Sequence, residues 1–263
     1  MADKIPEMTM DDVRHITDFI KKSVESTGSS GLVIGLSGGI DSAVVSKLAA
    51  DAIDPSEILN VFMPSRTTPA SDYKTTMELS QMWGTEYKIV DIQPAVDALT
   101  SVLLSDVEAP LERGNIAARC RMIVLYNLAK KRNYIVAGTS NKSEMMTGYF
   151  TKFGDGACDL TPLANLYKTE VRQIASLIGV PQEIIDKPPS AGFWEGQTDE
   201  SEMGISYGEL DVILRDLEAG LDDNSIARDA KLTVDEVVRM RELVASMEHK
   251  RHLPLRPDTV SRK

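Results

Sequence analysis

Hydrophobic positions in the first half of the chain alternate between recurrence at helical spacing and short uninterrupted apolar runs. Between residues 13 and 24 they recur at helical spacing, behind a helix-start signal that pairs Thr9 with Asp12. The compact apolar run Leu32–Leu36 comes next and predicts a strand. Good helix formers then fill Ala43–Ala52, so the opening order is helix, strand, glycine-containing turn and helix.

The order of strand and helix repeats along the chain as far as Gly138. Parallel strands need a crossover between them, usually a helix, so this alternation predicts an α/β fold. We expect a doubly wound, mostly parallel sheet with helices on both faces. Ser71 is the expected N-cap of the helix Tyr73–Met82, and Gly84 is the expected end of that helix. The expected strands are Ile58–Met63, Glu86–Ile92 and Tyr134–Gly138, and the expected helices are Tyr73–Met82, Pro94 to about Leu104 and Ile116–Arg132.

The second half changes character. Thr147–Pro162 and Pro188–Gly204 are long and rich in glycine and acidic residues, without helical or strand periodicity, and such loops are usually functional or mobile. A helix is expected between them, over Lys168–Ile178. Capping boxes that begin at Ser206 and Thr233 predict two late helices, ending near residues 218 and 247. No internal repeat divides the sequence, and we expect one domain over residues 1–263.

Composition restricts the partners more than the fold. With 263 residues, 42% hydrophobic and 26% charged, the chain has an ordinary globular composition. Its formal net charge of -11 disfavours general binding to nucleic acid or to anionic lipid. The two cysteines are too few for a disulfide framework. The first residues show no basic segment followed by an apolar run, and the sequence contains no uninterrupted apolar stretch of about 18 residues. We therefore expect a cytoplasmic protein without a membrane segment.

The strongest chemical signal is GLSGGIDS, over Gly35–Ser42, between a predicted strand and a predicted helix. Gly38 and Gly39 let the backbone approach a ligand, and the first N–H groups of the helix offer a phosphate site. Asp41 would repel phosphate unless a cation such as Mg²⁺ lay between them. The alternative is a tight turn with an ordinary helix cap, but the full motif in this context favours phosphate binding.

The string SGGIDS resembles the pyrophosphate-binding loop of the ATP pyrophosphatases, which adenylate their substrates. Four later segments add to this resemblance, and together they resemble the NAD+ synthetases over Gly35–Pro254. This family implies a Rossmann-like ATP pyrophosphatase fold, Mg²⁺, a homodimer, and ATP-dependent amidation of deamido-NAD with ammonia. The carboxylate would be adenylated first, and the products would be NAD+, AMP and pyrophosphate. The four segments are GTSNKSE (138–144), KFGDGACDLTPLANLYKTEVR (152–172), PPSAGFWEGQTDESEMGISYGELD (188–211) and HKRHLP (249–254).

The resemblance also implies roles for individual residues. Asp41 and Lys168 would be catalytic, while Asp41 and Glu144 would bind Mg²⁺. Arg121 is excluded, because a residue two positions along a helix from the substrate-binding Arg119 faces elsewhere. The implied ATP-binding positions are Gly35, Leu36, Ser37, Gly38, Gly39, Ile40, Asp41, Ser42, Thr139, Lys168 and Ser190. The implied deamido-NAD positions are Arg119, Lys152, Asp159, His249 and Lys250.

Three other functions have to be weighed. A GMP synthetase core shares the loop but takes a purine substrate, and the four later segments oppose it. A glutamine-dependent NAD+ synthetase needs a second domain to release ammonia, and we expect no glutaminase domain. A non-catalytic nucleotide-binding module has no need for a second acidic metal ligand or a distant phosphate-binding lysine. Ammonia-dependent amidation fits the sequence best.

Overall fold

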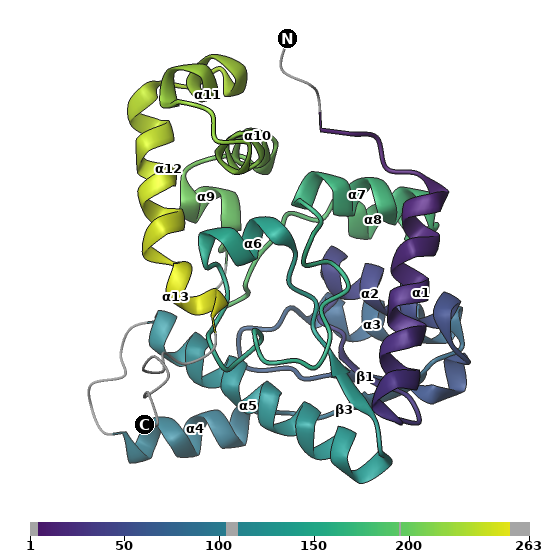
Figure 1. Ribbon diagram of the computed structural model, residues 1–263. Coiled ribbons are helices and arrows are strands. Elements are labelled where there is room, and N and C mark those ends of the chain that lie inside the picture. The colour runs from purple at the N-terminus through teal and green to yellow at the C-terminus, as the bar shows by residue number, and fades with distance from the viewer. Residues whose placement is uncertain (1–4, 104–109, 195, 253–263) are drawn as a thin grey trace, which may run out of the picture.

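A four-stranded parallel sheet, in the order β3-β2-β1-β4, forms the centre of the computed structural model (Figure 1). The structure describes residues 5–103, 110–194 and 196–252. Strands on the two sides of β1 are reached by winding in opposite directions, so a topological switch point lies between β1 and β4. The expected doubly wound α/β fold is confirmed. The strands are β1 Leu32–Gly35, β2 Ile58–Phe62, β3 Glu86–Ile89 and β4 Ile135–Ala137.

Helices cover both faces because alternate residues of β1 point to opposite sides. Leu32 and Ile34 pack into one core with α1, α2, α3, α7 and α8, while Val33 packs into another with α4 and α5. These buried apolar faces hold the helices against the sheet. The helices are α1 Met10–Thr27, α2 Ile40–Ala52, α3 Ala70–Trp83, α4 Gln93–Val102, α5 Pro110–Arg132, α7 Lys168–Leu177 and α8 Gln182–Ile185.

The last helices pack around a third core, opposite α1 in Figure 1. Leu210, Leu214 and Val237 lie at its centre, and Tyr167 connects it to the start of α7. The capping boxes at Ser206 and Thr233 are confirmed. Within the described ranges, no helix has both the length and the apolar character needed to cross a membrane. The remaining α-helices of the structure are α6 Lys142–Thr147, α9 Asp199–Met203, α10 Tyr207–Glu218, α11 Asp223–Ala230, α12 Val234–Ser246 and α13 Glu248–Arg251.

Several predicted boundaries were wrong. Helix α2 begins at Ile40 rather than Ala43, so the end of the glycine motif is already helical. Ser71 does not cap α3, because the helix begins earlier, after Pro69, and Ser71 lies in its first turn. Strand β3 ends at Ile89 rather than Ile92, although the backbone beyond it still donates to Phe62 and Pro64. Each difference reflects tertiary contacts that local propensity does not contain.

The short helices were not predicted, and α9 lies in the Pro188–Gly204 stretch expected to lack periodicity. Helix α5 begins at Pro110 rather than Ile116 and continues through Gly114. A Cβ on Gly114 would lie 2.3 Å from the Phe193 ring, so this glycine makes room for a packing contact. The predicted helix end at Leu104 lies outside the described residues.

A buried polar network joins β2 to its neighbours. The side chain of Asn60 is fully buried, exchanges hydrogen bonds with Ser46, and donates to Thr85 at 2.8 Å and Ser80 at 3.2 Å. A polar group in a strand core is tolerated only when its hydrogen bonds are made. Asn60 therefore fixes α2 and α3 against β2.

We predict that Asn60→Ala lowers the free energy of unfolding by about 2–3 kcal/mol, because it leaves buried hydroxyl groups without partners and opens a small cavity. Chemical denaturation measures the change. Asn224→Ala, at an exposed position of α11, is the matched control and should change stability by less than about 0.5 kcal/mol. Equal losses in the two variants would contradict the structural role of Asn60.

Candidate active site

The glycine motif connects β1 to α2 through a turn held together by its own side chains. The Ser42 hydroxyl donates to the Gly39 carbonyl at 3.0 Å and accepts from the Ser37 backbone at 3.1 Å. Gly38 has φ 82°, a conformation that favours glycine. Within the described chain, no side chain caps the start of α2, whose N-cap is Gly39. The first-turn N–H groups are therefore left for an anion, as the phosphate-loop interpretation requires.

A cleft of about 800 Å³ opens beside this turn. Its floor is the carboxyl edge of β1, β2 and β4, and its walls include parts of α5 and α12 together with Thr147–Thr151 and Lys187–Phe193. The carboxyl edge at a topological switch point is where ligands bind in doubly wound sheets. The two stretches expected to be functional loops are thus both brought to the cleft.

Three charged side chains meet at the cleft, each from the first turn of a different helix. Lys168 Nζ lies 2.5 Å from Asp41 Oδ2 and 3.0 Å from Glu144 Oε1. The lysine is only 1% exposed, and its ammonium also lies 5.1 Å from the centre of the Tyr207 ring. An ammonium removed from water needs such partners, so the two carboxylates fix where it sits.

Neighbouring polar residues orient this cluster. Asn141 caps α6 by accepting from the backbone of Glu144 at 3.0 Å, and its side-chain amide donates to Asp41 at 2.9 Å. Asp211 is fully buried on α10 and accepts from the Ser143 hydroxyl and the Thr169 backbone. The starts of α6 and α7 are thereby held together from behind. Asn141 and Asp211 therefore bring Glu144 and Lys168 within contact distance of each other.

Burial and the close charges perturb the ionisation of the cluster. Burial raises the pKa of Glu144 and the nearby Asp41 charge adds to that rise, which the Lys168 ammonium only partly opposes. Burial alone would lower the pKa of Lys168, but Asp41 and Glu144 outweigh it and raise this pKa above the usual range. Lys168 is therefore positively charged, and two carboxylates face it. Carboxylate oxygens are the ligands that Mg²⁺ prefers.

The described residues contain no group of three or more His, Cys, Asp or Glu side chains that could hold a metal alone. A Mg²⁺ ion at Asp41 and Glu144 would have to complete its shell with water and substrate oxygens, as is usual for phosphate-bound magnesium. The donor set fits a nucleotide-bound Mg²⁺ ion.

Most residues assigned to ATP line the cleft together. Gly38 is the exception, because its carbonyl oxygen accepts from Lys187 at 3.2 Å and the residue does not line the cleft. The Ser190 hydroxyl accepts from the Gly192 backbone at 3.1 Å. The lining members of the predicted site are Gly35, Leu36, Ser37, Gly39, Ile40, Asp41, Ser42, Thr139, Glu144, Lys168, Ser190 and Lys250.

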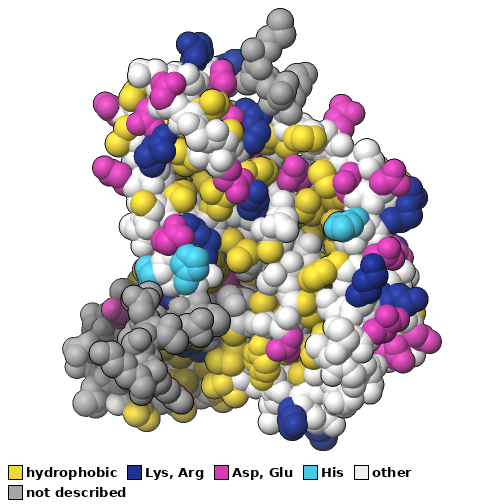
Figure 2. Space-filling model, viewed as in Figure 1, with side chains coloured by type: hydrophobic (Ala, Val, Ile, Leu, Met, Phe, Trp, Pro, Cys, Tyr) yellow, Lys and Arg dark blue, Asp and Glu magenta, His cyan; other side chains and the backbone are white. Residues whose placement is uncertain are grey.

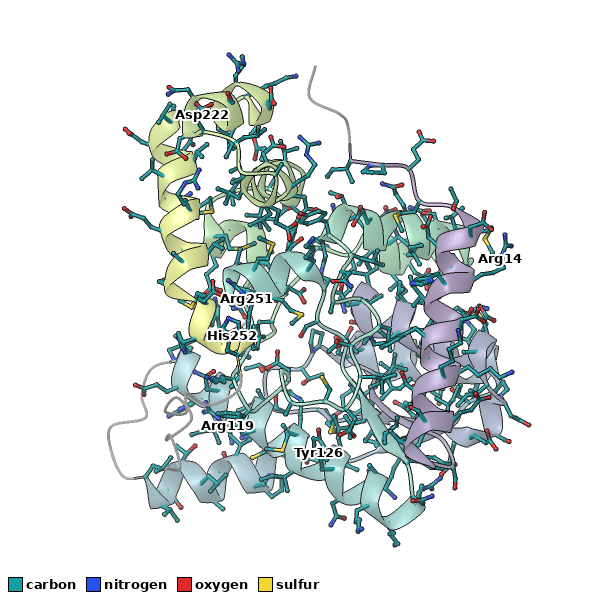
Figure 3. All side chains as sticks on the ribbon, viewed as in Figure 1. Arg14, Arg119, Tyr126, Asp222, Arg251 and His252 are labelled. Atoms are coloured by element: carbon teal, nitrogen blue, oxygen red, sulfur yellow. The ribbon has the colours of Figure 1, made fainter. Side chains whose placement is uncertain are left out.

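The residues assigned to the dinucleotide lie in three places. Arg119 donates to the Lys152 carbonyl at 3.3 Å, and Lys152 Nζ donates to the His249 carbonyl at 2.5 Å. These three form a chain of contacts from α5 to α13 outside the cleft lining, and Figure 3 shows Arg119 on that side of α5. Lys250 lines the cleft itself and donates to the backbone of Gly148.

Asp159 lies apart from the lining residues. Its carboxylate accepts from the Val136 backbone at 2.8 Å and from the Tyr126 hydroxyl at 3.4 Å. The Asp159 carboxylate therefore connects β4 to α5. The last two residues of the HKRHLP segment, Leu253 and Pro254, lie outside the described residues.

Sequence reasoning missed several residues of the site. Asn141 could have been found, because an Asn followed three residues later by Glu144 has the pattern of a helix start. Asp72 and Asp211 gave no such signal, since their partners are far away in the sequence. Arg121, which its helix position excluded from the site, lines the cleft and donates to the Met63 carbonyl at 3.1 Å, whereas Arg119 does not line it.

Comparisons with known proteins agree with this geometry. A family model described as NAD synthase matches residues 12–254. A relative from Thermococcus kodakarensis, named NH(3)-dependent NAD(+) synthetase, is 45% identical over 247 residues, which are 94% of this chain and 96% of the relative.

Two of the similar solved structures resemble this chain in both fold and sequence. NMN synthetase from Francisella tularensis has a TM-score of 0.85 and 37% identity, covering 95% of this chain and 98% of that one. NH3-dependent NAD synthetase from Campylobacter jejuni has a TM-score of 0.80 and 30% identity, covering 95% and 100%. With a family model that matches most of its length and relatives of similar length, this chain belongs to the NAD synthase family.

Proposed function

We propose that this protein is an ammonia-dependent NAD+ synthetase, a ligase that converts the nicotinate carboxylate of deamido-NAD into an amide. The observation that carries the proposal is the Asp41–Lys168–Glu144 cluster, which lies beside an uncapped helix start at the carboxyl edge of a parallel sheet. Relatives named NH(3)-dependent NAD(+) synthetase, matched over nearly their whole length, support ammonia as the nitrogen donor.

The reaction has two displacement steps. In the first, a carboxylate oxygen of deamido-NAD attacks the α-phosphorus of ATP, the α–β bridging bond breaks, and its electron pair leaves with pyrophosphate. In the second, the ammonia nitrogen attacks the carboxyl carbon, the bond to AMP breaks, and a proton is released with the amide product. The first-turn N–H groups of α2 would hold the departing phosphates, and the Lys168 ammonium would stabilise the charge that develops on them.

Asp41 and Glu144 would hold Mg²⁺, which neutralises phosphate charge when it is bound. Thr139, Ser190 and the backbone of Gly35–Ser42 would contact ATP, because they line the same cleft, with Gly38 contributing through the shape of the turn. We keep the dinucleotide positions implied by the resemblance. They are Arg119, Lys152, Asp159, His249 and Lys250.

We further propose that the chain works as one synthetase domain within a homodimer in the cytoplasm. Hydrophobic side chains gather along α4 and α5, at the lower edge of Figure 2. Val102 is 74% exposed and Ile123 58% exposed, which is costly in water and suits a contact between subunits. Cys120 and Cys158 are both free thiols, as expected in a reducing compartment. A light-scattering mass of one subunit at micromolar concentration would exclude the dimer.

We predict that ATP, Mg²⁺, ammonium and deamido-NAD give NAD+, AMP and pyrophosphate in equal amounts, because each amide requires one adenylation. Chromatography with a coupled pyrophosphate assay measures the three products. Nicotinate mononucleotide replaces deamido-NAD in a parallel reaction, since one similar structure is an NMN synthetase. Turnover with nicotinate mononucleotide but not with deamido-NAD would exclude deamido-NAD as the substrate. Turnover only with a purine acceptor would exclude the proposed function altogether.

We predict that Asp41→Asn lowers kcat/KM for ATP by about 100-fold or more, because it removes one of two charged magnesium ligands. The fold should persist at a lower thermal midpoint, since an asparagine can keep the hydrogen bond with Asn141 and Glu144 still pairs with Lys168, but the ion pair with position 41 is lost. Activity is measured over a range of Mg²⁺ concentrations, alongside the thermal midpoint. Asp51→Asn, at an exposed position of the same helix, is the control and should retain normal kinetics. Normal turnover by the Asp41→Asn variant would contradict the role assigned to Asp41.

A further inference from the structure

Lys187 lies at the root of the Pro188–Gly204 stretch and reaches the phosphate loop. Its Nζ lies 2.7 Å from Asp72 Oδ1 and 3.2 Å from the Gly38 carbonyl oxygen. Lys187 and Asp72 both line the cleft. One ammonium thus connects the loop, the first turn of α3 and the beginning of the Pro188–Gly204 stretch.

Asp72 is an obstacle to phosphate binding unless it is neutralised. Its side chain is 8% exposed, and its Cγ lies 3.3 Å from the position that a Cβ on Gly38 would take. A carboxylate packed against a phosphate loop repels the anion that the loop receives. In the part of the chain that the structure describes, Lys187 is the basic residue that forms an ion pair with Asp72.

The contact with Gly38 has a second effect. In a planar trans peptide, the carbonyl and the following N–H point in opposite directions. The carbonyl of Gly38 points to Lys187, so the N–H of Gly39, in the same peptide, points away from it. Gly39 lines the cleft, and its N–H makes only a long 3.3 Å bond to the Ser37 hydroxyl. Lys187 therefore helps to fix the orientation of this peptide, in which the Gly39 N–H can exchange its long bond to Ser37 for a phosphate oxygen.

We propose that Lys187 is a positioning residue for the triphosphate of ATP: it cancels the charge of Asp72 and orients the Gly38–Gly39 peptide. The proposal rests on the proposed function for the identity of the reaction, but the phosphate-binding role concerns ATP alone. Because Lys187 acts through Asp72 and Gly38, removing the Asp72 charge should offset much of the loss of Lys187.

The test compares Lys187→Met, Asp72→Asn and the double variant with the parent protein. Lys187→Met should raise KM for ATP by about 10- to 100-fold with kcat within about 3-fold, because an unpaired carboxylate then faces the phosphates. The double variant should return KM to within about 5-fold of the parent, since no uncompensated charge remains. Lys187→Arg should retain most of the affinity. Lys74→Met removes an exposed lysine of α3 that pairs with Glu78, and it is the control, with unchanged kinetics.

Thermal midpoints show that each variant is folded, and calorimetric titration with Mg-ATP measures binding without turnover. A parent protein that binds Mg-ATP but makes no NAD+ would refute the proposed function and leave the Lys187 test intact. A double variant as weak as Lys187→Met would overturn the charge-cancelling effect, and a Lys187→Met protein with normal ATP affinity would overturn the positioning role altogether.

Discussion

Burial of one ammonium group determines the arrangement of this site. A lysine at 1% exposure is stable only when opposite charges and hydrogen bonds replace its lost water, and Asp41 and Glu144 provide them. Each of the three residues lies in the first turn of a different helix, so pairing the lysine fixes α2, α6 and α7 relative to one another. The caps and anchors around them, Asn141 and Asp211, keep that meeting point rigid.

The same arrangement explains how an acidic protein can receive two anionic nucleotides. The formal charge of the chain is -11, and the cleft is lined by acidic as well as basic side chains. Lys168 and Lys187 each pair with carboxylates of the lining, so the cations and the carboxylates that would hold Mg²⁺ lie side by side. The start of α2 adds N–H groups that carry no counter-charge. Asp41 and Glu144 also lie at helix starts, where the dipole favours acids, while Lys168 opposes its own helix dipole and is stabilised by the two carboxylates. Local geometry, rather than net charge, decides what the cleft binds.

Much of this could be predicted from sequence because the governing interactions are local. Strand and helix alternation, the SGGIDS turn and the boxes at Ser206 and Thr233 depend on neighbours a few residues away. The pairing of Lys168 with Asp41 spans 127 positions, and that of Lys187 with Asp72 spans 115, so no local pattern contains them. Gly114 shows the same limit: it continues a helix because Phe193 packs against it. The NAD+ synthetase resemblance brought Asp41 and Lys168 together by analogy, whereas Lys187 belonged to no recognised pattern.

In this mechanism the cleft transfers AMP to the nicotinate carboxylate before ammonia attacks the carboxyl carbon. Deamido-NAD labelled with oxygen-18 at both carboxylate oxygens tests it directly, with mass spectrometry of the AMP released in a single turnover. Adenylation requires one labelled oxygen to leave with AMP, because the bond broken in the second step joins that oxygen to the carboxyl carbon. AMP that contains no label, formed while NAD+ accumulates, would contradict an adenylated intermediate.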